Sequence, residues 1–373
     1  MIYFDNAATS YPKPSAVTKE VVRCLNTYCG NPGRSSHRMA LLASEKIYEC
    51  RSRIASFINI PTPENVVFTY NATYALNMAI YSLTERDSHI LISDMEHNSV
   101  YRPVYKLKKE GVCDFDVFST DGDVIKNITS LIRKNTSLLV CTHISNVSGR
   151  VLPIEKIGEL CKKKKIRFIL DASQGIGHTK IDMQKVGCDV LCAPAHKGLF
   201  GIQGAGFAVF KRARNIKELV VGGSGVSSLS PNMPDTLPER LEAGTLSTPA
   251  IAALDAGISY INEVGIEEIE KRERMLRTLT LERLKSTKGV KVYDTDRECS
   301  NVTSFTVDGF SPSYLGEKLD ESGICVRSGF HCSPLAHKAL GSYENGSVRI
   351  SLGYFNTVNE IDSFYKRLKE IIK

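Results

Sequence analysis

A lysine in a setting suited to chemistry occurs in the segment Cys192–Gly201, which reads CAPAHKGLFG. The mostly apolar residues 188–193 have the length and composition of a buried strand. Lys197 would then follow a strand end, and the glycines after it would let another molecule approach the backbone closely. Charged groups are rarely buried unless they are paired or used chemically. We therefore expect Lys197 to form a Schiff base with pyridoxal phosphate, although the segment alone also fits an ordinary surface lysine.

Other side chains able to do chemistry follow the ends of other predicted strands. Ligands of open α/β sheets bind outside the carboxyl ends of the strands, so these side chains should meet at one edge. The groups at five strand ends are Asn71-Ala72-Thr73, Glu96-His97, Ser145-Asn146, Asp171 and His196-Lys197. The sequence therefore predicts a single site built from all five.

A second reactive centre is predicted around Cys332, in the segment VRSGFHCSP of residues 326–334. Arg327 and His331 are positive neighbours, and Pro334 marks a predicted helix start, so the thiol pKa should fall and favour a nucleophilic thiolate. A zinc site from His331, Cys332 and His337 lacks a fourth ligand of suitable spacing, and we expect no metal. Cys325 is a rival nucleophile, but its place in a predicted strand favours a core role.

Strands alternate with helices from residue 66 onward. Two helices are expected first, near residues 15–28 and 39–57. Amphipathic helices then separate predicted strands at 66–69, 89–93, 112–118, 137–142, 167–170, 189–193 and 205–210. This alternation predicts an α/β fold with a mostly parallel sheet covered by helices on both faces.

The pattern changes after about residue 250. Predicted helices at 267–284, 312–321 and 358–372 are interspersed with predicted strands at 290–293, 302–307, 324–327 and 347–352. This indicates a small C-terminal α+β domain. We expect residues 15–255 to form the large domain, and residues 1–14, an extended arm, to join residues 256–373 in the small one.

Composition excludes several classes of protein. The 373-residue chain is 42% hydrophobic and 24% charged, as in globular proteins, and has no apolar run of membrane-spanning length. Its start lacks the pattern of a secretory signal, and its 11 cysteines show no zinc-type spacing, so we expect a reducing, cytoplasmic location. The net charge is +7, but the basic run Lys162–Lys165 fits a helix C-terminus and lacks interleaved aromatic residues. We therefore expect neither a nucleic-acid nor a membrane partner.

Taken together, the motifs resemble the class V, fold type I enzymes that depend on pyridoxal phosphate. More closely, the chain resembles the cysteine desulfurase and selenocysteine lyase family in its Suf-type branch. The resemblance runs from Tyr3-Phe4-Asp5-Asn6-Ala7-Ala8 to Arg349-Ile350-Ser351-Leu352-Gly353, nearly the whole chain. It implies a fold type I architecture, a homodimer, and L-cysteine or L-selenocysteine as the substrate.

The resemblance also implies a set of cofactor contacts. Asp171 would pair with the pyridine nitrogen and keep it protonated, which makes the ring an electron sink; alternatively, Asp171 caps a turn. His97 would stack on the ring and relay protons, or else serve only as a capping or core histidine. Gln174 and Asn146 would donate to the ring hydroxyl oxygen. The phosphate would be bound by Ala72, Thr73, His196 and, across a dimer interface, Thr245, although Thr245 also fits a turn or helix cap.

The substrate contacts implied by the resemblance centre on Arg349. Its rigid guanidinium fork suits the α-carboxylate of an amino acid, although a lone arginine is more often an exposed strand residue in a surface ion pair. Asn146 would also reach this carboxylate. The remaining pocket residues would be Ala8, His37 and Arg327.

Two positions depart from the family pattern. Pro194 stands where relatives usually carry a hydroxyl residue that binds phosphate, so one side-chain donor is lost. Phe330 replaces the first histidine of the pattern Arg-x-Gly-His-His-Cys, and Cys332 keeps its place.

The reaction implied by the resemblance removes sulfur from L-cysteine to give L-alanine and a persulfide on Cys332. Lys197, helped by His97, would take the α-proton, and the persulfide would pass to an acceptor protein or thiol. The alternatives are a selenocysteine lyase and a class V aminotransferase or C–S lyase that does not use Cys332. A non-catalytic partner protein of the same fold is a further alternative, to which Pro194 points.

Overall fold

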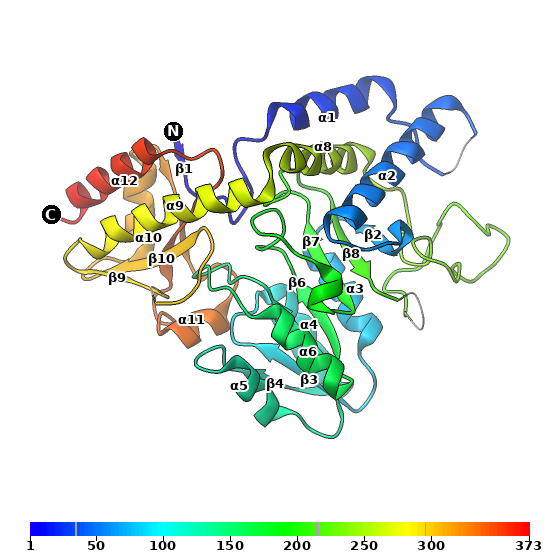
Figure 1. The fold of residues 1–373 in the computed structure, drawn as a ribbon, viewed down its shortest axis with the longest axis horizontal. Coiled ribbons are helices and arrows are strands. Elements are labelled where there is room, and N and C mark those ends of the chain that lie inside the picture. Colours follow the sequence, from blue (N-terminus) through cyan, green and yellow to red (C-terminus); the bar gives the residue numbers. More distant parts are fainter. Residues whose placement is uncertain (34–35, 213–215, 295) are drawn as a thin grey trace.

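The computed structural model describes residues 1–33, 36–212, 216–294 and 296–373 (Figure 1). Its largest sheet has seven strands in the order β2-β8-β7-β6-β5-β3-β4. Only β8 runs antiparallel to its neighbours, and the other pairs are parallel. The strands are β2 (Val66–Thr69), β3 (Ser88–Ser93), β4 (Cys113–Phe118), β5 (Thr136–Thr142), β6 (Arg167–Asp171), β7 (Val190–Pro194) and β8 (Gly206–Phe210). The predicted mostly parallel sheet is confirmed.

Helices cover both faces of this sheet. Alternate strand residues enter two cores: in β5, Leu139 and Cys141 lie in one, and Leu138 and Val140 in the other, because successive side chains of a strand point to opposite faces. The first core includes residues of α2, α5, α6, α7 and α8, and the second includes residues of α3 and α4. The helices are α1 (Ser15–Thr27), α2 (Arg38–Phe57), α3 (Ala72–Leu83), α4 (Asn98–Lys109), α5 (Val124–Leu131), α6 (Ile154–Lys164), α7 (Met183–Val186) and α8 (Thr248–Val264), with a 3-10 turn η1 at Pro63–Asn65.

The C-terminal part forms a second, smaller α+β layer. A four-stranded antiparallel sheet has the order β12-β13-β10-β9, and a parallel pair joins β1 to β11. Phe4 of the N-terminal arm is fully buried in the same core as Phe305 and Phe364. The elements are β1 (Ile2–Tyr3), α9 (Ile266–Lys285), β9 (Val290–Val292), β10 (Val302–Val307), α10 (Pro312–Asp320), β11 (Ile324–Cys325), β12 (Arg327–Gly329), α11 (Pro334–Leu340), β13 (Ser347–Ser351) and α12 (Val358–Ile371). The domain limits given above stay a prediction.

The predicted strand at 324–327 is wrong in one respect, because the chain forms two short strands there. Cys325 of β11 pairs with Tyr3, whereas Arg327 of β12 pairs with Arg349. The chain changes sheets at Val326 because each half finds a different partner strand. This switch brings Arg327 into the same sheet as Arg349.

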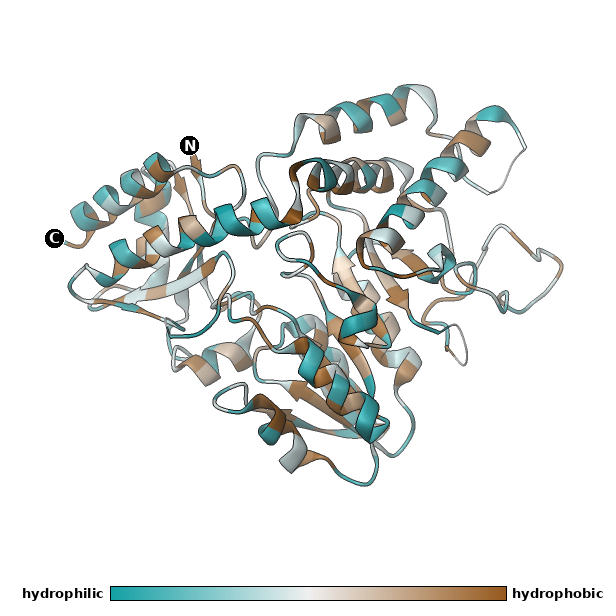
Figure 2. Cartoon of the chain, viewed as in Figure 1, coloured by the Kyte–Doolittle hydropathy of each residue, from teal (hydrophilic) through white to brown (hydrophobic). Residues whose placement is uncertain are grey.

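Hydropathy follows this layering. Hydrophobic segments gather on the strands of the large sheet and on α8, while α9 and α12 carry much hydrophilic surface (Figure 2). The long helix α9 leads from the end of α8 to the small sheet (Figure 1). In the part of the chain that the structure describes, no helix is long and apolar enough to cross a membrane.

Candidate active site

Residues that follow five strands of the large sheet line one cavity. Eight of the predicted site residues lie together here: Ala72, Thr73, His97, Asn146, Asp171, Gln174, His196 and Lys197. The other lining residues are Asn71, Leu76, Ser99, Thr142, Ser173 and Pro194. The prediction that polar groups at the strand ends meet at one edge of the sheet therefore agrees with the structure.

The start of α3 forms one end of the cavity. Asn71 caps the helix, and its side chain accepts a hydrogen bond from the Tyr74 N–H at 2.9 Å. This leaves the N–H groups of Ala72 and Thr73 available, and such groups at a helix start bind anions. A Cβ on Gly206 would lie 2.6 Å from the carbonyl carbon of Asn71, so only glycine lets β8 pass this close.

Asp171 and Lys197 are charged groups of opposite sign in the cavity. Asp171 is buried, and one of its carboxylate oxygens accepts the Ser173 N–H at 2.9 Å. Burial lowers the pKa of Lys197 to about 8, although the Asp171 carboxylate opposes this shift. Burial also raises the pKa of Asp171, while the Ser173 bonds and Lys197 act against that rise. The neutral amine that a nucleophile requires is therefore far more populated near neutral pH than in an ordinary lysine.

His97 caps the start of α4 from the neighbouring strand end. Its Nδ1 accepts the Ser99 N–H at 3.0 Å and lies 2.9 Å from Ser99 Oγ. Burial, followed by the positive charge of Lys197, lowers the pKa of His97 to about 4. The imidazole is therefore neutral at physiological pH. His97 therefore has the capping role that the sequence also allowed, and the cap holds its imidazole ring beside the cavity.

Glu96 also lies at a predicted strand end, and sequence reasoning assigns it no role. Its carboxyl is fully buried and accepts the Thr142 N–H at 2.8 Å and the Ser93 hydroxyl at 2.5 Å. Burial raises the pKa of Glu96 to about 8. Thr142 lies beside Asp171 in the sheet, so Glu96 supports the strand end next to that carboxylate.

Lys13 was not predicted to approach the site. Its ammonium donates to the backbone oxygen of His196 at 2.9 Å, and Ser10 N–H donates to the same oxygen at 3.0 Å. The N-terminal arm therefore holds the residue beside Lys197. No sequence signal could reveal this contact, since the arm and His196 are joined only in the folded chain.

The loop carrying Cys332 is attached to the cavity by two asparagines. Asn146 donates from Nδ2 to the His331 oxygen at 2.8 Å and accepts from Ser333 Oγ at 2.7 Å. The Asn98 N–H donates to the Cys332 oxygen at 2.8 Å. His331 and Cys332 both have left-handed backbone conformations, with φ of 49° and 59°. Cys332 is exposed, and its sulfur lies 3.6 Å from an Arg327 nitrogen.

Arg349 lies behind this loop and is only 1% exposed, so the alternative of a surface arginine is wrong. It donates to the Asn146 backbone oxygen at 3.0 Å and to an Asp5 carboxylate oxygen at 2.6 Å. Its Nε is buried without a partner in the described part of the chain. The Nε–H of Arg349 is therefore an unused hydrogen-bond donor close to Asn146, the residue that joins the cavity to the Cys332 loop.

Besides Arg327, Cys332 and Arg349, three further predicted residues do not line this cavity in the single chain. Ala8 follows Ala7, whose oxygen accepts from Gln174 Nε2 at 2.9 Å. His37 is exposed and caps α2, accepting the Ala40 N–H at 3.3 Å. Thr245 is exposed and lines a separate surface cavity with Gly244 and Ser224. Their predicted roles stay predictions.

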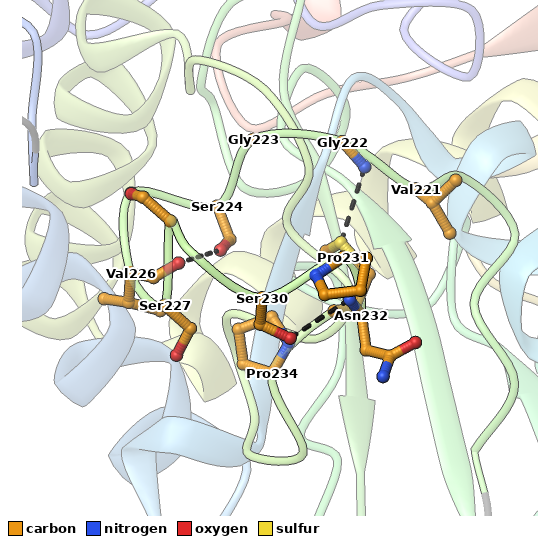
Figure 3. Close-up of a pocket in the computed structure, with 13 residues that line it drawn as sticks. Val221, Gly222, Gly223, Ser224, Val226, Ser227, Ser230, Pro231, Asn232 and Pro234 are labelled. Atoms are coloured by element: carbon orange, nitrogen blue, oxygen red, sulfur yellow. Dashed lines mark hydrogen bonds between the residues drawn. The ribbon is translucent and has the colours of Figure 1, made fainter.

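A larger surface hollow lies elsewhere. It is formed by residues 221–228 and 230–234 of a single loop, with mainly glycine, serine and proline around it (Figure 3). It contains no residue predicted for the site. Its hydrogen bonds include local ones, such as the Gly222 N–H to Met233 Sδ and the Asn232 N–H to Ser230 Oγ, and the Gly244 N–H also donates to the Gly223 oxygen.

Pro194 and His196 shape the phosphate side of the predicted site. Pro194 lines the cavity and has neither a hydroxyl nor an N–H, so it offers no donor. His196 Nδ1 is buried without a hydrogen-bond partner among the described residues. This nitrogen is available to an anion in the cavity.

The two histidines of the rejected zinc alternative make other contacts. His331 Nε2 lies 3.1 Å from Ser347 Oγ, and His337 Nδ1 lies 2.8 Å from Ser342 Oγ. Burial holds the pKa of His331 well below its usual range. Among the described residues, no three His, Cys, Asp or Glu side chains are grouped to hold a metal ion.

Comparisons with known proteins give a consistent result. A family model described as aminotransferase class-V matches residues 2–364. A probable cysteine desulfurase of Methanothermobacter thermautotrophicus is 32% identical, over 99% of this chain and 94% of that protein. One from Pyrococcus abyssi is 32% identical over 100% and 94%. The apo structure of a cysteine desulfurase from Thermococcus onnurineus NA1 superposes with a TM-score of 0.92 at 30% identity, covering 100% of this chain and 94% of that one.

Proposed function

We infer, because the chain belongs to the aminotransferase class-V family, that it is a cysteine desulfurase that uses pyridoxal phosphate. The resemblance drawn from the sequence motifs is confirmed by this membership, and so is the fold type I architecture. Two curated relatives are each named probable cysteine desulfurase, and this chain aligns with 94% of each of them. The substrate, the residue roles and the acceptor are proposals argued below.

Three separate features of the cavity suit pyridoxal phosphate. The free N–H groups of Ala72 and Thr73 and the unpartnered His196 Nδ1 suit a phosphate. Asp171 places a buried carboxylate where a ring nitrogen would need an acidic partner. Lys197 provides an amine with a pKa of about 8 for a covalent link to an aldehyde.

Bound there, pyridoxal phosphate would supply an electron sink for the carbon next to the amino group. The residues of the chain would do the rest. Asp171 would hold its negative charge against the ring nitrogen, and His97 would lie neutral beside the ring. Lys197, once released by the incoming amine, would take the α-proton of the substrate. Arg349 and Asn146 would bind the α-carboxylate.

Cys332 would perform the sulfur transfer. Its thiolate attacks the substrate sulfur and forms an S–S bond while the substrate C–S bond breaks. The carbon fragment keeps the electron pair, takes up protons and leaves as L-alanine. The sulfur stays on Cys332 as a persulfide, and an acceptor thiol or protein then removes it. Exposure of Cys332 leaves this persulfide accessible.

One observation carries the proposal: Asn146 lines the Lys197 cavity and also binds the residues on either side of Cys332. The candidate nucleophile is therefore attached to the candidate cofactor site, although 135 residues separate Cys332 from Lys197 in the numbering. An aminotransferase or a simple C–S lyase has no need for a cysteine held in this position.

The proposal is tested by loading the purified chain with pyridoxal phosphate and supplying L-cysteine and L-selenocysteine in parallel. Alanine, sulfide, selenide and enzyme-bound sulfur are measured with and without a thiol reductant. Alanine formed together with one sulfur atom on the enzyme before reduction supports the proposal. Pyruvate and ammonia in place of alanine would indicate a lyase, and alanine from selenocysteine alone would indicate a selenocysteine lyase.

We also propose that the chain works as a homodimer in the cytoplasm. Thr245 is exposed and lies outside the lining of the Lys197 cavity, as a residue that completes the phosphate site of a second copy would. None of the 11 cysteines, all within the described residues, forms a disulfide, which fits a reducing compartment. Light scattering of the loaded protein tests the dimer, and a monomer with full activity would contradict it.

A further inference from the structure

A buried polar cluster that the proposed mechanism does not use lies between the two sheets. It consists of His178, Glu273 and Asn301, which are 4%, 2% and 2% exposed. His178 Nδ1 lies 2.9 Å from Glu273 Oε2 and 3.4 Å from Asn301 Nδ2. Polar groups at this depth are costly unless they are hydrogen-bonded, so the three side chains favour one mutual arrangement.

The cluster is joined on one side to the residue after Lys197. His178 lies in the segment that follows Asp171, the last residue of β6, and its ring packs against Gly198. A Cβ on Gly198 would lie 2.9 Å from His178 Nε2 and 2.3 Å from the Ile176 oxygen. The backbone at Gly198, next to Lys197, therefore packs directly against the segment that follows Asp171.

On its other side the cluster is joined to the strand that carries Arg349. Leu352, just beyond β13, donates to the Asn301 oxygen at 3.0 Å, and Asn301 Nδ2 donates to the Leu352 oxygen at 2.5 Å. Glu273 lies on α9, and the adjacent Arg272 donates to the Tyr354 oxygen at 2.6 Å and the Asn356 oxygen at 2.8 Å. The segment after β13 is thus held by α9 and by Asn301 together.

We propose that His178, Glu273 and Asn301 are positioning residues that set Arg349 at a fixed distance from Lys197. An amino-acid substrate must present its amine to the group held by Lys197 while its carboxylate reaches Arg349. Binding of the amine and the carboxylate at once depends on how the two sheets are positioned relative to each other, because misplaced groups bind poorly even when all are present. This inference rests on the proposed function, since it concerns the carboxylate of that substrate.

The test compares Glu273→Gln with Glu270→Gln, a matched change on the same helix. Glu270 bonds Thr179 and Arg274, and within the described residues His178 pairs with Glu273 and not with Glu270. Each cofactor-loaded variant is assayed for KM and kcat with L-cysteine, and for the Kd of L-alanine from the cofactor absorbance. We expect Glu273→Gln to raise both KM and this Kd about ten-fold with kcat changed less than about three-fold, the pattern of lost uniform binding.

Further variants separate positioning from a purely structural role. Asn301→Ser should raise the Kd of L-alanine as Glu273→Gln does. The double variant His178→Gln with Glu273→Gln, whose two amides can bond each other, should bind L-alanine no worse than Glu273→Gln alone. A lowered melting temperature with unchanged KM and Kd in Glu273→Gln and Asn301→Ser would overturn the proposal, as would an equal effect of Glu270→Gln.

Failure of the positioning proposal can be distinguished from failure of the proposed function. If the wild-type protein forms no alanine from cysteine, the proposed function fails. The Kd of L-alanine in the same variants then still decides whether the cluster positions a carboxylate site, because that measurement needs no turnover.

Discussion

Arg327 and Arg349 lie directly opposite each other on the antiparallel strands β12 and β13. Two cations in this relation repel, and the only carboxylate bonded to either within the described residues is Asp5, which pairs with Arg349. Opposed like charges destabilise a sheet unless an anion joins them. We therefore propose this pair, which lies next to Asn146, as the anion site for the carboxylate of an amino-acid substrate.

Arg349→Lys should weaken substrate binding. Lysine keeps the charge but loses the two-pronged geometry that holds Asn146 and Asp5 at once. We expect KM for L-cysteine to rise roughly 10- to 100-fold, about 1.4 to 2.7 kcal/mol. Steady-state kinetics measure this, with the exposed Arg283→Lys as the control. An unchanged KM would exclude Arg349 from carboxylate binding.

Cys332→Ser should abolish desulfuration without unfolding the protein. Serine preserves the size of the side chain on an exposed position but cannot form a persulfide, so alanine formation should fall at least about 100-fold. The melting temperature and the cofactor spectrum should stay as in wild type. Cys29→Ser, at the other exposed cysteine, is the control and should be fully active. Equal turnover of the two variants would point to a lyase.

Uptake of pyridoxal phosphate by the unloaded protein should accelerate with pH up to about 8 and then level off. Only the neutral amine attacks an aldehyde, and burial lowers the pKa of Lys197 to about 8 from its ordinary 10.5. Stopped-flow absorbance follows the reaction. A rate that still climbs between pH 9 and pH 10 would show that Lys197 keeps its ordinary pKa.

Lys197→Met should stabilise the unloaded protein below pH 8. The pKa of Lys197 is lower in the folded state, so the unfolded chain binds more protons between about pH 8 and 10.5. Burial of this lysine therefore costs stability below pH 8, and the cost disappears as pH rises to 10.5. Urea unfolding at pH 7 and pH 10.5 measures the difference, with the exposed Lys126→Met as control. A gain of the same size at both pH values would contradict this linkage.

Asn146→Ala should loosen the Cys332 loop. The change removes the bonds to the His331 oxygen and the Ser333 hydroxyl and leaves buried groups without partners, at a cost of about 1 to 3 kcal/mol. Amide exchange of residues 329–333 should then quicken about ten-fold or more, since each 1.4 kcal/mol of lost protection is a factor of ten. Exchange rates equal to those of wild type would mean that Asn98 alone holds the loop.

Much of the site was open to sequence reasoning because it is built from strand ends. Strands and helices of the large sheet follow local hydrophobic periodicity, and parallel strands bring their carboxyl ends to one edge whatever the loop lengths. Thr73, His97, Asn146, Asp171 and Lys197 were therefore predicted to meet, and they do. The family motifs gave the class of enzyme for the same reason, since each motif is local.

The remaining features were decided by tertiary structure. The pairing of Arg349 with Asp5 joins residues 344 positions apart, and the split of residues 324–327 into two strands depends on which partner each half meets. The burial of Glu96 depends on neighbouring strands β3 and β5, and the His178–Glu273 contact joins segments 95 residues apart. Burial and long-range pairing are properties of the whole fold, because a side chain loses its water only when distant segments close over it. The local sequence pattern thus determined the helices, the strands and the chemical groups at their ends. Packing determined the pKa values of buried groups, the hydrogen bonds that hold the Cys332 loop, and the pairing of distant strands.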